Sequence, residues 1–214
     1  MGTSFLVSSG KGGVGKTQTA INLGTALSLF GADVLIIDGN LPTPDISLYY
    51  GIPSEVKTLN DVIRGDAKPE KAIYTHPETG LKIMPASVQM NAAKGLTQDK
   101  IKATLKGLTK YAGTLVIDSA PGLGAEVVTA MRASDQCIVV TNPEIPALTD
   151  AFKTIQLANY IGADVVGVVL TRTGRYRGEL DDATIRATLG DDVPIIGKIP
   201  EDYHVPIAAL RSQS

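Results

Sequence analysis

The segment at residues 10–17 constrains this chain more than any other part of it. It reads Gly-Lys-Gly-Gly-Val-Gly-Lys-Thr, a G-x-x-x-x-G-K-T pattern that carries a second lysine, Lys11, near its start. It follows the apolar stretch at residues 5–7 and opens an alanine- and leucine-rich segment, Thr19–Phe30, which Gly31 closes. Strand, glycine loop and helix therefore stand in the order that a phosphate-binding loop requires. The alternative, a glycine-rich turn with chance lysines, does not explain this context.

The chemistry of the pattern explains its residue types. Glycines allow the backbone to fold tightly enough for several N–H groups to surround phosphate oxygens, and the following helix points its positive end at the same anion. Lys16 adds a mobile positive charge for the β and γ phosphates, and Thr17 offers a hydroxyl to Mg²⁺, which keeps most of its waters in such sites. The sequence therefore predicts a nucleotide phosphate site formed by Gly10, Lys11, Gly12, Gly13, Val14, Gly15, Lys16, Thr17 and Gln18.

Short apolar segments alternate with helical ones along the chain. The apolar segments are continuous runs, which is typical of strands buried on both faces of a mainly parallel sheet. No repeat, low-complexity tract or linker interrupts them. We therefore expect residues 1–214 to form a single α/β domain, with one doubly wound, mainly parallel sheet flanked by helices and a ligand at the carboxyl ends of its strands. The expected strands are Phe5–Ser8, Asp33–Ile37, Leu81–Met84, Leu115–Ile117, Ile138–Val140, Val165–Leu170 and Pro194–Ile196.

Composition limits the classes of function. The formal net charge is −2 at pH 7, so we expect no overall attraction to nucleic acid. The single cysteine, Cys137, lies in the apolar run at residues 136–140, which favours a small buried side chain over a reactive thiol and excludes a cysteine-rich metal site. No stretch is long and apolar enough to cross a bilayer, and the N-terminus lacks the regions of a secretory signal, so we expect a cytoplasmic protein.

Two of the apolar runs end in an aspartate. Residues 35–40 read Leu-Ile-Ile-Asp-Gly-Asn, and residues 115–118 read Leu-Val-Ile-Asp. An isolated aspartate after a strand is more often a helix cap or a turn former. Beside a phosphate loop, however, a strand-end carboxylate can hold a water of the bound magnesium ion. We therefore predict that Asp38 and Asp118 lie on the metal side of the phosphates, together with Thr17.

These features together resemble the deviant Walker-A ATPases, the P-loop superfamily that includes MinD and ParA. The resemblance rests on residues 11–17, on Asp38 at its strand end and on Asp-Ser-Ala-Pro-Gly at residues 118–122. It extends over nearly the whole chain through Val-Thr-Asn-Pro-Glu at residues 140–144 and Val-Leu-Thr-Arg at residues 169–172. Within the superfamily, the chain is most similar to archaeal MinD-type proteins.

The resemblance implies an enzyme that binds ATP or ADP with Mg²⁺ and hydrolyses ATP. It also implies an ATP-dependent homodimer whose nucleotides lie between the two subunits. Lys11 is then the signature lysine that reaches the phosphates of the partner subunit's ATP. It acts there as an arginine finger does, because it neutralises charge that develops during phosphoryl transfer, together with Lys16 of the phosphate loop. The alternative for Lys11 is a solvated surface lysine.

One position of the implied active site departs from the family pattern. The resemblance implies an aspartate two residues after Asp38 that orients the attacking water, and this chain has Asn40 there. An amide hydrogen-bonds to water but is a very poor proton acceptor, so we expect hydrolysis slowed by roughly ten- to a thousandfold relative to an aspartate enzyme. The alternative is that Asn40 is an ordinary turn residue. Asp45 stands where the family often has asparagine, and a contribution from it stays open.

The signal for a base pocket is weaker. By resemblance, the pocket is lined by Thr171 and Arg172 and by Pro200, Glu201 and Asp202. The family often has an asparagine that reads the base at the position of Thr171. Preference for ATP over GTP is therefore an expectation from the family alone.

The family comparison also implies partners and moving parts. We expect an activating or cargo protein, and switch loops at Asp38–Asp45 and Asp118–Gly124 that sense the γ-phosphate. The segment Ala147–Tyr160 is a candidate partner surface, although packing on the sheet explains its amphipathic pattern equally well. MinD-type proteins usually end in an amphipathic helix that binds an anionic membrane surface peripherally, and residues 210–214 carry no such pattern.

Three functions are compatible with these features. The favoured one is a MinD-like ATPase switch that positions other proteins at a division site or a cell pole. The second is a related ATPase with another cargo, such as a ParA-like partitioning protein or a metal-cluster loader, which the lack of a basic surface and of paired cysteines weakens. The third is a nucleotide-dependent scaffold in which Asn40 has made hydrolysis negligible.

Overall fold

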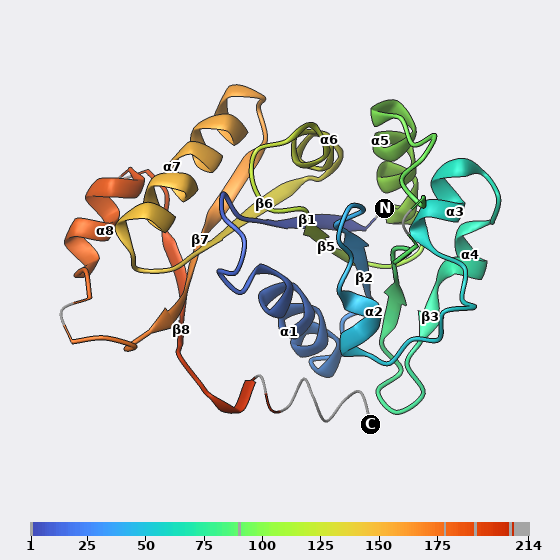
Figure 1. Cartoon of the computed structure of the whole chain (residues 1–214), viewed down its shortest axis with the longest axis horizontal. Coiled ribbons are helices and arrows are strands. Elements are labelled where there is room, and N and C mark those ends of the chain that lie inside the picture. Colours follow the sequence, from blue (N-terminus) through green and yellow to red (C-terminus); the bar gives the residue numbers. More distant parts are fainter. Residues whose placement is uncertain (1, 90, 178, 191, 206, 208–214) are drawn as a thin grey trace.

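The computed structural model describes residues 2–89, 91–177, 179–190, 192–205 and 207. An eight-stranded sheet runs through these residues in the order β3-β4-β2-β5-β1-β6-β7-β8, with helices on both faces (Figure 1). Neighbouring strands are parallel except β3 and β4, which are antiparallel. The predicted doubly wound, mainly parallel sheet is therefore confirmed.

The strands and helices follow the predicted alternation. All seven predicted strands are present with shifted ends, and the short edge strand β3 and the short helices α2, α3 and α4 were not predicted. The strands are β1 (Thr3–Ser8), β2 (Val34–Gly39), β3 (Tyr74–Thr75), β4 (Lys82–Met84), β5 (Thr114–Ser119), β6 (Gln136–Thr141), β7 (Asp164–Thr173) and β8 (Ile195–Pro200). The helices are α1 (Lys16–Leu29), α2 (Ile46–Tyr49), α3 (Leu59–Arg64), α4 (Pro69–Ala72), α5 (Gln98–Gly107), α6 (Ala125–Ala133), α7 (Ile145–Tyr160) and α8 (Asp182–Leu189), with a 3₁₀ turn at Leu108–Lys110.

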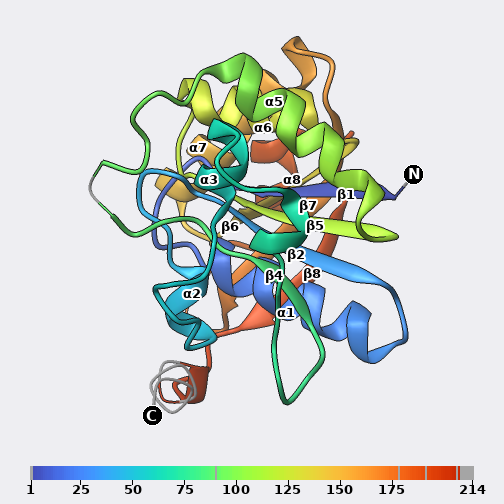
Figure 2. The same ribbon diagram turned by 90° about the vertical axis from the view of Figure 1, so that its right-hand side faces the viewer.

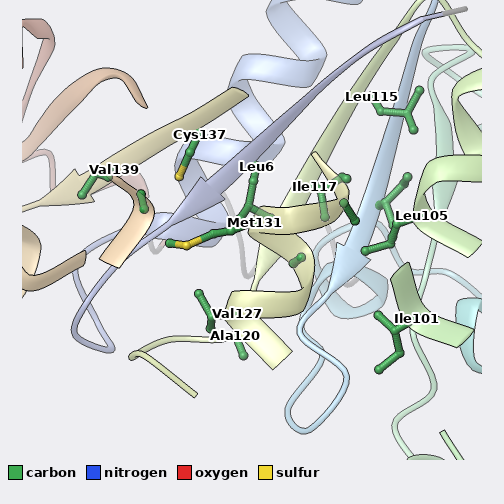
Figure 3. Close-up of a cluster of buried hydrophobic side chains, with 14 of the residues drawn as sticks. Leu6, Ile101, Leu105, Leu115, Ile117, Ala120, Val127, Met131, Cys137 and Val139 are labelled. Carbon is green, nitrogen blue, oxygen red and sulfur yellow. The ribbon is translucent and has the colours of Figure 1, made fainter. Parts of the chain in front are cut away.

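The central strands are buried on both faces, which explains their continuous apolar sequences. Successive residues of one strand enter opposite cores. Leu6 belongs to the core that includes apolar residues of α5, α6 and α7, whereas Val7 belongs to the core that includes apolar residues of α1 and α2. Figure 2 shows α1 and α5 on opposite sides of the strands. In the larger core, α6 places Val127 and Met131 against the sheet (Figure 3). Cys137 lies in this core and burial raises the pKa of its thiol to about 12, so the predicted buried role of the cysteine is confirmed.

Helix α1 begins three residues earlier than predicted, directly at the phosphate loop. Gly15, at its N-cap, has φ +87°, and Gly31, just past its end, has φ +88°. Both values lie in the left-handed region that glycine adopts without a Cβ penalty. Within the helix, Gly24 lies against Ile36, where an added Cβ would meet the Ile36 side chain at 2.5 Å. This close approach lets α1 sit directly on β2.

The carboxyl ends of β1, β2, β5 and β6 gather at one edge of the sheet, because these four central strands are parallel. The loops that follow them therefore lie together and form the site described next. The residues 210–214, which carry no amphipathic pattern, fall outside the described residues. In the described part of the chain, none of the helices has the length and apolar character needed to span a membrane.

Candidate functional site

The phosphate loop links β1 to α1 and owes its path to glycine. Gly13 has φ +79° and Gly15 has φ +87°, so both positions favour glycine over other residues. A Cβ on Gly10 would lie 2.3 Å from the backbone oxygen of Asp150 in α7, which makes this glycine a close-packing position. An added Cβ on Gly13 would meet no described atom within 4 Å. The loop is thus anchored at its start and open at its middle.

The first turn of α1 supplies the anion-binding groups that the motif predicts. The helix begins at Lys16, and Thr19 is the first residue whose N–H finds a partner on the helix, the carbonyl of Gly15 at 2.9 Å. The N–H groups of Lys16, Thr17 and Gln18 precede this bond and have no intrahelical acceptor. Together with the helix dipole, they favour a bound anion at this end of α1.

Asp118 joins both predicted phosphate-loop side chains. Lys16 Nζ donates to Asp118 Oδ1 at 2.6 Å, and Thr17 Oγ1 donates to Asp118 Oδ2 at 2.7 Å. Lys16 and Asp118 are both buried. Burial raises the pKa of the Asp118 carboxyl, and the charge of Lys16 partly opposes this effect. The ammonium of Lys16 has three N–H donors, so the pair leaves it further donors for phosphate oxygens.

Asp38 is the register partner of Asp118 in the neighbouring strand and is fully buried. Its Oδ1 accepts the N–H of Asn40, and its Oδ2 accepts the N–H groups of Asp45 and Ile46, each at 3.1 Å. Burial and the charge of Asp118 nevertheless raise the pKa of Asp38 to about 7. Two adjacent buried carboxyls with raised pKa values are typical of a place where a cation binds.

The donor set fits Mg²⁺ bound with a nucleotide. Mg²⁺ takes one or two protein oxygens and completes its shell with water and phosphate oxygens. The Thr17 hydroxyl, which lies 2.7 Å from Asp118, offers a direct ligand, and Asp118 and Asp38 offer acceptors for metal-bound waters. The loop beside them is open at Gly13, where an added Cβ would meet no described atom within 4 Å. Thr17, Asp38 and Asp118 thus lie side by side, and their assignment to the metal side of the phosphates stays a prediction.

Asn40 is also buried, and it lies in the loop that follows β2. Its Nδ2 donates to the carbonyl oxygen of Thr43, and its Oδ1 accepts the Thr43 hydroxyl at 3.2 Å. The structure therefore places the predicted catalytic amide next to Asp38, with both ends bound to Thr43. The Thr43 contact could not be anticipated from the sequence.

Lys11 differs from Lys16 in its environment. Its side chain is exposed, whereas its backbone carbonyl accepts the Ser9 hydroxyl at 3.0 Å. Two large apolar side chains on neighbouring segments, Leu123 and Ile145, are 40% and 53% exposed. Residue 122 is tied to the phosphate loop, because its N–H donates to the Ser9 carbonyl at 2.9 Å. Lys11 and Leu123 are thus exposed on segments joined by this bond, and Ile145 is exposed at the start of α7, whose Asp150 lies against Gly10.

A cavity of about 630 Å³ adjoins the first turn of α1 and brings the predicted base-pocket residues together. Its walls are largely apolar and include Leu23, Val169 and Ile199. Arg172 and Glu201 form a half-exposed ion pair at its rim, with Nε and Oε2 3.6 Å apart. The cavity lining contains all the residues predicted for the base pocket, together with Gln18 of the predicted phosphate site: Thr171, Arg172, Pro200, Glu201, Asp202 and Gln18.

Thr171 also braces the phosphate loop. Its buried hydroxyl lies 2.5 Å from the carbonyl oxygen of Val14 and 2.8 Å from Oδ1 of Asn142. The carbonyl oxygen of Thr141 is a third acceptor at 3.3 Å. A hydroxyl has a single proton to donate, so these acceptors share it. The sequence singles out Asn142 only through its place in residues 140–144, which resemble the family. Its role at the junction of β6, β7 and the loop depends on tertiary placement.

Comparisons with known proteins agree with this geometry. A ParA-group family model described as a NUBPL iron-transfer P-loop NTPase matches residues 1–174. An uncharacterized ATP-binding protein of Methanocaldococcus jannaschii is 36% identical over 209 residues, covering 98% of this chain and 78% of that protein. The septum site-determining protein MinD of Thermotoga maritima is 32% identical over 219 residues, covering 98% and 79%.

A solved structure gives the same result at the level of the fold. The septum site-determining protein MinD of Pyrococcus horikoshii, complexed with Mg-ADP, matches with a TM-score of 0.91 and 33% identity, covering 99% of this chain and 86% of that one. The match therefore includes all the elements that form the site. The chain belongs to the MinD/ParA family of P-loop ATPases.

Proposed function

We propose that this protein is a MinD-like switch that binds Mg-ATP, dimerises with the nucleotides between its subunits, and hydrolyses ATP slowly. The observation that carries the proposal is the contrast between its two loop lysines. Lys16 is buried and paired with Asp118, whereas Lys11 is exposed on the same loop. A second cation that points outward from a phosphate site is suited to the nucleotide of a second subunit.

The surroundings of Lys11 support a face that meets another copy of the chain. Leu123 follows residue 122, whose N–H donates to the Ser9 carbonyl, and Ile145 begins α7, whose Asp150 lies against Gly10; both apolar side chains are exposed. Apolar side chains beside a charged contact are typical of an interface core with a polar anchor. The Lys11 ammonium then neutralises charge on the partner subunit's γ-phosphate, which couples hydrolysis to dimerisation.

Slow hydrolysis follows from the residue at position 40. Catalysis of phosphoryl transfer depends mainly on positioning and electrostatic stabilisation, and these come from the phosphate loop, Lys16 and the metal. Thr17, Asp118 and Asp38 are the residues that would hold Mg²⁺, which would supply positive charge to the phosphates. Asn40 offers no carboxylate to accept a proton from water.

For the biological role, we propose the positioning of other proteins in the cell through nucleotide-dependent partner binding, with an activating or cargo protein as partner. The relatives with MinD in their names support this role. A cluster-loading role lacks support in the thiol chemistry, since the one cysteine is buried in the core. The net charge of −2 gives no support to a nucleic-acid partner.

The test of the proposed switch is the mass of the protein in solution by analytical ultracentrifugation. We expect 22.4 kDa with Mg-ADP and about twice that mass with Mg-ATP. Lys11→Ala stays monomeric with ATP, while Lys106→Ala, which removes an exposed lysine of α5, dimerises normally. A wild-type monomer with ATP bound, shown by calorimetry, overturns the proposed dimer.

The proposed slow rate is tested by Asn40→Asp. Restoring a carboxylate at this position raises steady-state phosphate release by roughly ten- to a thousandfold. Asp99→Asn, an exposed change of similar chemistry in α5, leaves the rate unaltered. An unchanged rate in Asn40→Asp removes the amide as the cause of slow hydrolysis.

A further inference from the structure

The loop between Asp38 and α2 is stiffened by two prolines. Its sequence at residues 40–45 is Asn-Leu-Pro-Thr-Pro-Asp, so prolines stand on both sides of Thr43. Each proline fixes its own φ and has no N–H to donate, and the second one also restricts the backbone of Thr43 to extended conformations. The loop is therefore stiff but poor in backbone donors.

Asn40 supplies the donor that the prolines lack. Its Nδ2 donates to the carbonyl of Thr43, and its Oδ1 accepts the Thr43 hydroxyl. We call this pair of hydrogen bonds between Asn40 and Thr43 the Asn40 clasp. Asn40 is only 5% exposed. A carboxylate at this position could accept the Thr43 hydroxyl but would have no proton for the Thr43 carbonyl. The clasp is thus specific to an amide.

The clasp holds the far end of the loop against Asp38. After Thr43 and Pro44, the N–H groups of Asp45 and Ile46 both donate to Asp38 Oδ2 at 3.1 Å. Asp38 Oδ1 takes the N–H of Asn40 itself at 3.1 Å. Asn40 therefore contributes to the loop twice, with its backbone to Asp38 and with its side chain to Thr43.

We propose that Asn40 is a positioning residue whose amide closes the 40–45 loop onto Asp38, and that it acts on hydrolysis through this loop and not by contact with the attacking water. The inference rests on the proposed function, since Asp38 is placed on the metal side of the nucleotide there. Both polar atoms of the amide are already bound to Thr43, and orienting a water would require that clasp to open. The amide of Asn40 thus orders the loop, but unlike a carboxylate it does not accept a proton from water.

The structural half of this inference is tested by amide hydrogen exchange in the full chain, followed by NMR without nucleotide. In Asn40→Ala, the amides of Asp45 and Ile46 exchange at least roughly tenfold faster than in the wild type, because they lose the clasp that holds them on Asp38. Asn159→Ala, on the exposed side of α7, is the matched control and leaves both rates unchanged. Unaltered exchange in Asn40→Ala overturns the inference.

A pair of substitutions at Thr43 examines the clasp from its other side. Thr43→Ser keeps the hydroxyl and exchanges like the wild type. Thr43→Val removes the hydroxyl but keeps the carbonyl, so the exchange of Asp45 and Ile46 lies between that of the wild type and that of Asn40→Ala. Equal exchange in the serine and valine variants contradicts a role for the Thr43 hydroxyl in holding the loop.

The functional half is tested by single-turnover phosphate release with Mg-ATP. Asn40→Ala lowers the rate by roughly tenfold or more, since a small displacement of a metal-side group has a large effect, while ATP affinity stays within about threefold. Asn40→Asp loses the amide donor as well, so Asp45 and Ile46 exchange as fast as in Asn40→Ala. Its new carboxylate accepts a proton from water, and this gain outweighs the loss of loop order, so phosphate release is faster than in both Asn40→Ala and the wild type. If Asn40→Ala hydrolyses ATP slowly but exchanges Asp45 and Ile46 like the wild type, Asn40 contacts the water directly. If Asn40→Ala exchanges these amides fast but hydrolyses ATP at the wild-type rate, the order of the loop does not affect hydrolysis.

Failure of this inference is separable from failure of the proposed function. The exchange experiment needs neither ATP nor a dimer, so its outcome concerns the loop alone. ATP-dependent dimerisation of the wild type, measured by mass, concerns the switch alone. A dimer that forms normally while exchange is unaffected by Asn40→Ala rejects the clasp and leaves the switch intact.

Discussion

The phosphate end and the base end of the site are built in different ways. At the phosphate end, Lys16, Asp118 and Asp38 are buried and every carboxylate oxygen accepts a hydrogen bond. At the base end, an apolar cavity of about 630 Å³ has a half-exposed ion pair, Arg172 with Glu201, at its rim. One end fixes charges and the other offers apolar surface.

This difference implies that the phosphate end governs the rate of hydrolysis and that the base end contributes to nucleotide affinity. Buried charges in fixed geometry stabilise a developing charge strongly, because no solvent has to reorganise around them. An apolar cavity gains free energy from burying a flat ring but discriminates weakly between rings of similar shape. Substitutions at the phosphate end should therefore change turnover and stability markedly, and substitutions at the rim of the base end should change little.

The largest effect is expected for Lys16→Ala. It removes the main positive charge of the loop and leaves the buried Asp118 without its ion-pair partner, so phosphate release falls by roughly 100- to 1,000-fold. Lys106→Ala is the control for loss of an exposed lysine. A Lys16→Ala rate within about tenfold of the wild type would show that the phosphate end does not dominate the chemistry.

The pH dependence of stability tests the buried carboxyls. The pKa of Asp38 is about 7 in the folded chain against 3.8 ordinarily, and that of Asp118 is also raised. Between these values the folded protein keeps a proton that the unfolded chain releases. The free energy of unfolding therefore falls as pH rises from about 4 to about 7, by roughly 1 kcal/mol per pH unit for a single such group.

Chemical denaturation without nucleotide or Mg²⁺ measures this slope, and Asp38→Asn, which cannot titrate, should flatten it. Asp99→Asn changes an exposed carboxylate and should keep the wild-type slope. A stability that rises between pH 4 and pH 7 in the wild type, with no flattening in Asp38→Asn, contradicts the raised pKa of Asp38.

Thr171 lies at the junction of the two ends and should show an intermediate effect. Thr171→Val keeps the shape but leaves the Val14 carbonyl and the Asn142 side chain without their donor, which lowers the free energy of unfolding by about 1–3 kcal/mol. Thr171→Ser keeps the hydroxyl and should lose less. Denaturant titration distinguishes the two variants, and equal losses would mean that methyl packing and not the hydrogen bond matters.

The smallest effect is expected at the rim of the base end. Arg172 and Glu201 are half-exposed and 3.6 Å apart, and such pairs contribute less than about 1 kcal/mol. Arg172→Ala should therefore change the calorimetric affinity for Mg-ADP by less than about threefold. A loss greater than about tenfold would indicate direct contact between Arg172 and the nucleotide.

The residues predicted for the phosphate end lie together in the structure, and the sequence could single them out because their determinants are local. Glycines with positive φ, a lysine and a threonine at fixed spacing, and the strand-end residues Asp38 and Asp118 are all visible in short segments. Continuous apolar runs likewise located the buried strands. These features depend on neighbours in sequence, so periodicity and spacing reveal them.

The contacts that the sequence did not predict depend on side chains that meet only in the fold. Thr171 of β7 reaches Val14 of the phosphate loop across 157 positions of the chain, and Asn142 joins them from the turn after β6. Asn40 and Thr43 are only three residues apart in the sequence. Whether the Asn40 side chain reaches the carbonyl and the hydroxyl of Thr43 depends, however, on how the prolines bend the loop. The edge strand β3, with two residues, carried too little pattern to be recognised.

The central claim is that hydrolysis takes place between two subunits, and the most direct measurement is phosphate release per protomer as protein concentration is raised at saturating Mg-ATP. The account predicts that the wild-type rate per protomer rises with concentration and then saturates as dimers form, whereas Lys11→Ala stays low throughout and Lys106→Ala follows the wild type. A wild-type rate per protomer that is independent of concentration, down to levels where the mass is that of a monomer, would contradict the account.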